Sequence, residues 1–172
     1  MNPILQAARR SRVVDLVLFG LIVLALLVVV AILPEPVVTH LEGRARAIDG
    51  DSLVLEGSEI RLQGIDAPEA RQSCTKNGAA WSCGREAARQ LARLMRSGSV
   101  RCEAYDRDQH NRLLATCWVG DVEINRRLVE QGWAVSFGRY HAAEREAQNA
   151  KRGLWAGEFD RPRDWRAEHM GN

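Results

Sequence analysis

The feature that most restricts the fold of this chain is an uncharged, strongly apolar run near its N-terminus. No charged residue occurs between Asp15 and Glu35, and residues 16–33 are almost entirely Leu, Val, Ile and Ala. A helix of this length, at about 1.5 Å per residue, matches the roughly 30 Å hydrocarbon core of a bilayer. We therefore expect one transmembrane anchor over residues 13–33.

The charges beside this run predict its orientation. Three arginines precede it, Arg9, Arg10 and Arg12. Because the cytoplasmic flank carries the excess of Lys and Arg, we expect residues 1–12 in the cytoplasm and everything after Pro34 in the periplasm or outside the cell. The alternative is a cleaved signal peptide, with residues 29–31 as its cleavage site. Signal h-regions usually span about 7 to 15 residues, so a retained anchor is preferred.

Four cysteines lie in the exported part of the chain, Cys74, Cys83, Cys102 and Cys117. An even number of cysteines in an oxidising compartment indicates disulfide bonds. Three pairings are open, of which the local one joins Cys74 to Cys83 and Cys102 to Cys117. A zinc site is the alternative, but the chain has no Cys-x-x-Cys spacing and its His residues do not cluster near the thiols.

The remainder of the chain predicts one α+β domain over residues 43–160, after a linker at 34–42 and before a C-terminal tail at 161–172. Strands are expected at 44–48, 53–56, 59–65, 100–105 and 113–119, and helices at 78–97, from an N-cap at Asn125 to Gly132, and at 140–151. Five strands with a helix inserted after the third are typical of an oligonucleotide-binding (OB) barrel. We therefore expect a five-stranded, OB-fold-like Greek-key β-barrel with about three helices.

The charge balance argues against a protein that binds nucleic acid through overall charge alone. The chain has 24 Lys and Arg and 22 Asp and Glu, and without the charged residues before residue 36 these counts are 21 and 20. A binder that depends on neutralising phosphates is usually more basic than this.

Three short segments combine carboxylates and arginines in the ratio that phosphodiester hydrolysis needs: 49–52, 61–69 and 108–112. Singly, each is ordinary, because an Asp-Gly turn, a strand that ends at a proline and a surface arginine are common features. Together they offer two carboxylates for a divalent cation, a third for a water molecule and two arginines for a phosphate. The combination predicts a nuclease.

Five motifs add a family resemblance: Asp-Gly-Asp at 49–51, Arg-x-x-Gly-Ile-Asp-Ala-Pro-Glu at 61–69, Asp-Arg-Asp-x-x-x-Arg-Leu-Leu-Ala at 106–115, Val-Glu-Gln-Gly-Trp-Ala at 129–134 and Gly-Leu-Trp at 153–155. With these motifs the chain resembles the thermonuclease, or staphylococcal-nuclease-like, family from about Gly43 to Trp155. The resemblance implies a calcium-dependent endonuclease and exonuclease on an OB barrel. Its substrates would be DNA and RNA, cleaved with little base preference to products that end in 3′-phosphates.

The same resemblance implies a calcium site. Asp51 and Asp66 would be the ligands, together with the backbone carbonyl of Ala67, and Asp49 would support them from nearby. Calcium accepts six to eight oxygen ligands in loose geometry, so two carboxylates and one carbonyl suffice when water and phosphate supply the others.

The resemblance also implies the catalytic roles. Glu69 would orient or deprotonate the attacking water, while Arg61 and Arg112 would bind the phosphate. Arginine suits this role because its planar fork grips two phosphate oxygens and keeps its charge at any working pH. Tyr140 would lie beside the bound nucleotide. No protein partner is inferred.

One geometric condition must hold for a shared site. Arg61 and Asp66 are an odd number of residues apart, so in a regular strand their side chains would face opposite sides of the sheet. We expect Gly64 to mark a bulge or kink that brings both to one rim. Two other functions stay open: a barrel that binds single-stranded nucleic acid without cleaving it, and an envelope module that holds calcium for rigidity.

Overall fold

The structure is a computed structural model that describes residues 15–28 and 38–169. The chain divides into two units, residues 1–36 and residues 37–172. In the first unit, residues 15–28 are helical. Among the described residues, no helix is both long and apolar enough to cross a membrane. The predicted anchor at 13–33 extends at both ends outside the described residues.

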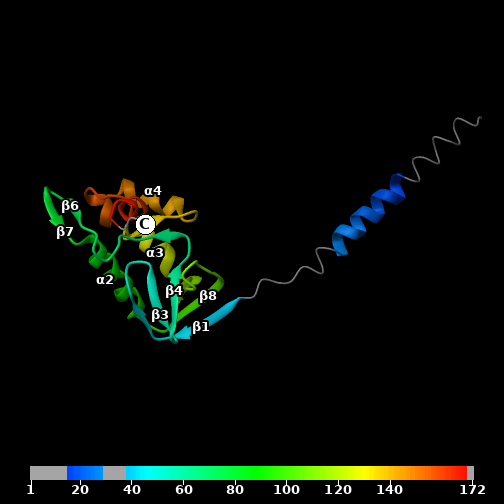
Figure 1. Ribbon diagram of the computed structural model, residues 1–172, viewed down its shortest axis with the longest axis horizontal. Helices are drawn as coiled ribbons and strands as arrows, with labels where there is room; N and C mark the ends of the chain where they lie inside the picture. Colours follow the sequence, from blue (N-terminus) through cyan, green and yellow to red (C-terminus); the bar gives the residue numbers. More distant parts are fainter. Residues whose placement is uncertain (1–14, 29–37, 170–172) are drawn as a thin grey trace, which may run out of the picture. The chain divides into compact units, whose positions relative to one another are not determined.

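The second unit is built on a curled, mixed sheet of seven strands (Figure 1). Its strands are β1 (Thr39–Gly43), β2 (Ala45–Ala47), β3 (Ser52–Leu55), β4 (Ser58–Leu62), β8 (Val100–Arg107), β9 (Leu113–Val119) and β10 (Val122–Glu123). The order is β1-β8-β9-β4-β3-β2, with β10 paired to β9. Only the β4–β9 pairing within this sheet is parallel. The α+β class is confirmed, and the sheet is a half-barrel consistent with an OB-like fold. The predicted number of five strands was wrong, because this sheet has seven.

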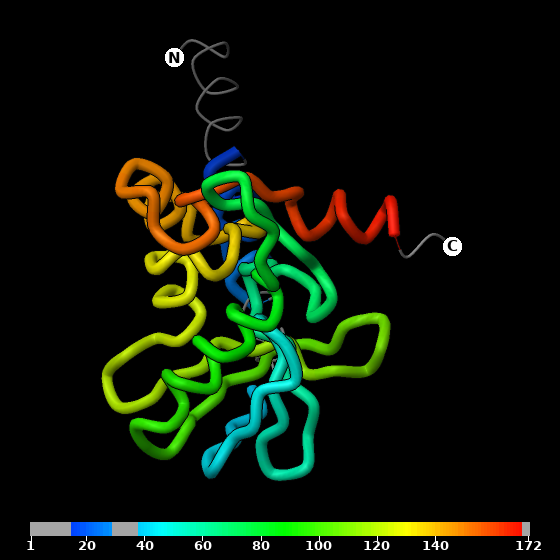
Figure 2. The backbone as a smooth tube through the Cα atoms, turned by 90° about the vertical axis from the view of Figure 1, so that its left-hand side faces the viewer, coloured from blue at the N-terminus to red at the C-terminus, as the bar shows by residue number. Residues whose placement is uncertain are grey.

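Four α-helices and one 3-10 helix complete the second unit: α2 (Cys83–Met95), α3 (Ile124–Glu130), α4 (His141–Asn149), η1 (Gly153–Ala156) and α5 (Pro162–His169). In α2, the side chains of Ala87, Leu91 and Met95 recur every four residues and are buried, which gives the helix one apolar face. This face packs into the same core as Leu53 of β3 and Ile60 of β4, both of which are fully buried. The views show α4 and α5 together at one end of this unit (Figures 1 and 2).

Two short ladders lie outside the main sheet. β5 (Ile65–Asp66) pairs with β11 (Val135–Ser136), and β6 (Cys74–Lys76) forms a hairpin with β7 (Ala79–Trp81). The hairpin occupies residues where the sequence predicts the start of a helix at 78. The helix begins only at Cys83, because Asn77 and Gly78 adopt positive φ angles of 52° and 76°, which form a hairpin turn.

Two predicted boundaries were wrong. Residues 39–42, assigned to a linker, belong to β1, an edge strand that pairs antiparallel with β8 through the backbone groups on one side. Residues 161–172, assigned to a tail, contain the helix α5. Its first residue is Pro162, whose fixed φ angle and missing N–H suit the first turn of a helix.

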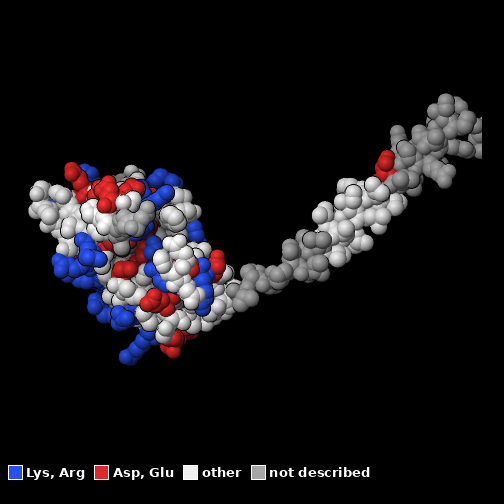
Figure 3. Space-filling view, in the orientation of Figure 1, with Lys and Arg blue, Asp and Glu red and all other residues white. Residues whose placement is uncertain are grey.

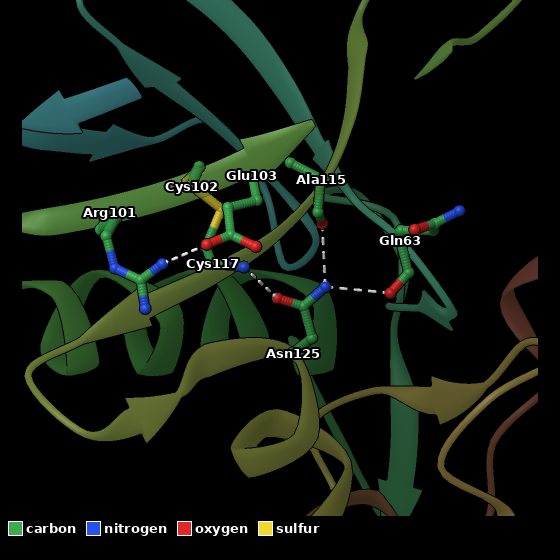
Figure 4. The surroundings of a disulfide bond; sticks show 7 residues. All are labelled: Gln63, Arg101, Cys102, Glu103, Ala115, Cys117 and Asn125. Atoms are coloured by element: carbon green, nitrogen blue, oxygen red, sulfur yellow. Dashed lines mark hydrogen bonds and ion pairs between the residues drawn. A yellow bond between two sulfur atoms is a disulfide. The ribbon is translucent and has the colours of Figure 1, made fainter. Parts of the chain in front are cut away.

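Asn125 was predicted as the N-cap of α3, but Glu123 holds that position and Asn125 is fully buried. Its side-chain oxygen accepts a hydrogen bond from the backbone N–H of Cys117 at 3.0 Å. Its amide nitrogen donates to the carbonyls of Gln63, at 2.9 Å, and Ala115, at 3.0 Å (Figure 4). Buried polar side chains need hydrogen-bond partners, and Asn125 finds all three of these in the backbone. These bonds hold the start of α3 against β9 and the end of β4.

Both disulfides follow the local pairing. Cys74 is bonded to Cys83, which ties the β6–β7 hairpin to the start of α2. Cys102 is bonded to Cys117, its facing residue across the β8–β9 ladder (Figure 4). The prediction of two disulfides is confirmed, and no cysteine is left for a zinc site.

Candidate active site

The first carboxylate of the site is positioned by the turn that leads into β3. Asp49 accepts a hydrogen bond from the backbone N–H of Asp51 at 3.0 Å and so supports this turn. Asp51 itself is only 3% exposed. Its Oδ1 atom accepts a hydrogen bond from the hydroxyl of Ser52 at 3.1 Å, and its Oδ2 atom accepts one from the backbone N–H of Ala67 at 3.0 Å. Asp51 thus reaches the segment that carries the second carboxylate.

A break in the chain at Gly64 places that second carboxylate. β4 ends at Leu62 and β5 begins at Ile65, and Gly64 between them has a φ of 80°, in the left-handed region. The carbonyl of Gly64 accepts a hydrogen bond from the N–H of Phe137 at 2.9 Å. The predicted kink is confirmed, because the Arg61 Nη2 and Asp66 Oδ1 atoms lie 3.0 Å apart.

Arg61 joins the two carboxylates. Its Nη2 atom lies 3.1 Å from Asp51 Oδ2 and 3.0 Å from Asp66 Oδ1. Both acids are buried, while the side chain of Arg61 is 23% exposed and so keeps partial access to solvent. A single cationic nitrogen therefore occupies the point on which two buried carboxylates converge.

Arg112 reaches the same region from the turn before β9, where Asn111 has a φ of 64°. Its Nε and Nη2 atoms donate to Asp108 Oδ2 at 2.8 and 2.7 Å, and its Nη1 atom lies 3.5 Å from Ser52 Oγ. Partial burial alone would raise the pKa of Asp108. The hydrogen bonds from Arg112 and from the N–H of His110 outweigh it and hold that pKa below its ordinary value.

Glu69 follows Asp66 across the proline turn and lies beside an arginine that the sequence did not predict. Arg166 of α5 donates from Nη1 to Asp66 Oδ1 at 3.0 Å and to Glu69 Oε1 at 2.8 Å. Its Nη2 atom donates to Asp66 Oδ2 at 3.0 Å. No local signal points to Arg166, because it comes from a segment assigned to the tail and meets its partners across about a hundred residues of chain.

The fully buried side chain of Gln72 connects the Glu69 turn to α5. Its Oε1 atom accepts the backbone N–H of Glu69 at 3.2 Å, and its Nε2 atom donates to the carbonyl of Asp160 at 2.7 Å. Thr75 and Glu158 exchange two further backbone hydrogen bonds, at 2.9 and 2.8 Å. The segment that leads into α5 is therefore fixed to the loop that carries Glu69.

Burial sets the electrostatics of the acids. Desolvation raises the pKa of Asp51 to about 7, because the attraction of Arg61 and the hydrogen bond from Ala67 compensate it only in part and Asp49 and Asp66 add repulsion. A further positive charge beside Asp51 would stabilise its ionised form and so lower its pKa. The site can therefore accept a cation.

The donor set of this rim fits a hard divalent cation of the calcium type. Asp51 and Asp66 direct oxygen atoms to one point, and the backbone of Ala67 lies next to them. Among the residues that the structure describes, no group of three or more His, Cys, Asp and Glu side chains forms a metal centre. Water and substrate would have to complete the coordination of such a cation.

A pocket of about 340 Å³ adjoins the site. The residues that line it include Arg61, Asp66 and Arg166 of the site, together with Leu114, Phe137 and Arg139. The predicted nucleotide contact, Tyr140, does not line this pocket. Its hydroxyl donates to Glu123 instead. Phe137, which directly follows β11 and has an exposed side chain, does line the pocket.

The fold and the site define a class of small α+β protein in which a curled sheet carries paired buried carboxylates and arginines at one rim. Residues 59–157 match the family model described as "Staphylococcal nuclease homologue". The chain belongs to this family. The matched range contains Arg61, Asp66, Glu69 and Arg112, whereas Asp51 and Arg166 lie outside it.

Among three proteins similar to this chain, two are named as nucleases. The chain is 37% identical over 129 residues to the "Succinoglycan biosynthesis protein ExoI" of Rhizobium meliloti (strain 1021), covering 70% of this chain and 65% of that protein. It is 33% identical over 125 residues to the "Probable staphylococcal-like nuclease CAN3" of Oryza sativa subsp. japonica, covering 69% and 31%. It is 30% identical over 151 residues to the "Probable endonuclease lcl3" of Sclerotinia sclerotiorum, covering 73% and 54%. The chain thus spans less than two thirds of each of these relatives.

Proposed function

We propose that this protein is a calcium-dependent nuclease that hydrolyses phosphodiester bonds of DNA or RNA with little sequence specificity. One observation carries the proposal: the Nη2 atom of Arg61 lies within about 3 Å of both Asp51 and Asp66. Ser52 links Arg112 to the same pair, and Glu69 lies across the bridging guanidinium of Arg166. Family membership and the names of two relatives support the same reaction.

In this proposal Asp51, Asp66 and the carbonyl of Ala67 hold the calcium ion. The bound ion would neutralise phosphoryl charge and lower the pKa of water. Asp49 acts indirectly, through the turn that presents Asp51.

Glu69 orients the attacking water and accepts its proton as the water oxygen bonds to phosphorus. The bond from phosphorus to the 5′-oxygen breaks and this oxygen takes up a proton from solvent, which leaves a 3′-phosphate and a 5′-hydroxyl. Arg61 and Arg112 bind the phosphate oxygens and stabilise the charge that develops on them.

We also propose that residues 13–33 anchor the protein in a membrane, with residues 1–12 in the cytoplasm and the nuclease unit in the periplasm or outside the cell. The apolar run and its basic flank support this arrangement. The two disulfides support it independently, since such bonds persist in oxidising compartments.

The test is cleavage of single-stranded DNA and RNA by the full chain in mild detergent, with calcium or with a chelator. We expect cleavage only with calcium. Arg112→Ala should slow it by about 10²- to 10³-fold, the usual effect of losing one preorganised donor. The control is Arg89→Ala on α2, whose side chain is 66% exposed and forms an ion pair with Glu86.

The controls also separate the alternatives. Binding of nucleic acid without cleavage would identify a binding module, and calcium-dependent stability without either activity would identify an envelope module. Equal rates for Arg112→Ala and Arg89→Ala would contradict the role assigned to Arg112.

A further inference from the structure

Helix α5 delivers a third arginine to the carboxylates of the site. Arg166 meets Asp66 with both arms of its guanidinium, at 3.0 Å each, and reaches Glu69 at 2.8 Å. Its side chain is 31% exposed, whereas that of Asp66 is 4% exposed. Bidentate, charge-assisted pairs of this geometry are among the stronger hydrogen bonds in proteins. Arg166 therefore belongs to the site, through hydrogen bonds to both of these carboxylates.

These contacts occupy atoms that the proposed reaction needs. Asp66 Oδ1 accepts from Arg61 and Arg166, and Asp66 Oδ2 accepts from Arg166 as well. Glu69 Oε1 also accepts from Arg166. A cation that uses an Asp66 oxygen must displace or share one of these donors, and a water that uses Glu69 Oε1 must do the same.

The position of Arg166 depends on more than its own ion pairs. Gln72 fastens the carbonyl of Asp160 to the Glu69 turn, and Thr75 pairs with Glu158 just before it. These anchors fix the segment that enters α5 at Pro162. The guanidinium of Arg166 is thus held at the site by the fold.

We propose that Arg166 is a positioning residue that holds Asp66 and Glu69 together until a divalent cation takes its place on Asp66. This inference rests on the proposed cation site, and it extends that site to a helix beyond the family match. The cation and the guanidinium of Arg166 then compete for the oxygens of Asp66, so the cation binds when Arg166 releases them. The apparent dissociation constant for calcium equals the intrinsic one divided by the fraction of molecules in which the fork is open.

Isothermal titration of the full chain with calcium alone tests the competition. Arg166→Gln removes both the fork and the charge, and we expect it to bind calcium at least tenfold more tightly than the wild type. Arg166→Lys keeps the charge without the planar fork, so its affinity should lie between these two. Arg163→Gln is the matched control, because it removes an exposed arginine of the same helix and should leave the affinity unchanged.

Equal affinity of wild type and Arg166→Gln would overturn the inference, as would an equal gain in Arg163→Gln. Slower cleavage by Arg166→Gln with unchanged calcium affinity would instead place Arg166 on the phosphate and also overturn it. Absence of calcium binding in every variant would overturn it too. The titration needs no nucleic acid, so tighter calcium binding without any cleavage would support the inference while contradicting the proposed nuclease.

Discussion

At the scale of single residues, the site depends on balancing buried negative charge. Asp51 and Asp66 are each 3% exposed, and an isolated buried carboxylate would be costly. Arg61 supplies the shared countercharge, and Arg166 adds another at Asp66. At Asp51, desolvation by burial outweighs the attraction of Arg61, and this keeps the pKa of Asp51 raised.

The raised pKa of Asp51 predicts how the metal-free protein responds to pH. The folded state holds this proton up to about pH 7, whereas the ordinary value is 3.8. The contribution of Asp51 to the free energy of unfolding should therefore fall as pH rises from about 4 to about 7. The Asn side chain of Asp51→Asn is neutral at every pH. The free energy of unfolding of this variant should therefore rise relative to that of the wild type as pH increases from about 4 to about 7.

Guanidinium unfolding at several pH values, in the presence of a chelator, measures this difference. A constant difference between wild type and Asp51→Asn would contradict the assigned shift. Calcium should restore stability to the wild type at pH 7 and leave Asp51→Asn little changed.

At the scale of elements, the turn at Gly64 and the extra hairpin decide which residues meet. A kink at Gly64 was predicted from the sequence, because Arg61 and Asp66 are five residues apart and would face opposite sides of a regular strand. The sequence offered no comparable reason to expect the β6–β7 hairpin or α5, since neither has a long periodic pattern. The roles of Arg166 and Gln72 at the site were not predicted for the same reason. Both side chains bond to residues far away in the sequence, and these meet only when short segments pack together.

Replacing Gly64 tests the kink. Gly64→Ala puts a side chain at a φ of 80°, and its Cβ would lie 2.8 Å from Arg139 Cβ. Gly57→Ala is the matched control, because Gly57 has a φ of 76° with no atom within 4 Å of the added Cβ. Both variants lose about 1–2 kcal/mol through the left-handed backbone. Gly64→Ala should lose about 1–3 kcal/mol more by overpacking, measured by denaturant unfolding, and equal losses would contradict this account.

The two disulfides should differ in their effect on activity. Removing Cys102 and Cys117 together should cost about 2–4 kcal/mol of stability, because the closed loop constrains the unfolded chain. Removing Cys74 and Cys83 frees the hairpin whose Thr75 pairs with Glu158. For the same loss of stability, we expect the variant without Cys74 and Cys83 to lose more cleavage activity than the variant without Cys102 and Cys117. The opposite order would argue that the β6–β7 hairpin does not position the site.

At the scale of the whole chain, composition predicted the absence of a strongly basic surface. Figure 3 shows basic and acidic residues intermixed on the visible face of the second unit. Such a surface gives little long-range attraction for nucleic acid, so affinity must come from the local cluster of arginines. Sequence motifs identified Arg61, Glu69 and Arg112, whereas the pocket wall at Phe137 and the contact of Tyr140 with Glu123 depend on tertiary packing.

The proposed anchor predicts where the chain is found. We expect the full chain in the membrane fraction, resistant to alkaline extraction, with its second unit accessible to protease added from outside the cell. A variant that begins at residue 37, the start of the second unit, should leave the membrane fraction. Recovery of the full chain in the soluble fraction would contradict a retained anchor.

The most direct test of the catalytic assignment is the single-turnover rate of DNA cleavage by wild type and Glu69→Gln at saturating calcium. Glu69→Gln keeps the size of the side chain but cannot take a proton from water. A general base typically contributes 10²- to 10⁴-fold, so we predict a loss of at least about a hundredfold. We also predict that wild-type products carry 3′-phosphates. An intact protein that fails to cleave, or a Glu69→Gln variant that cleaves at the wild-type rate, would contradict the account.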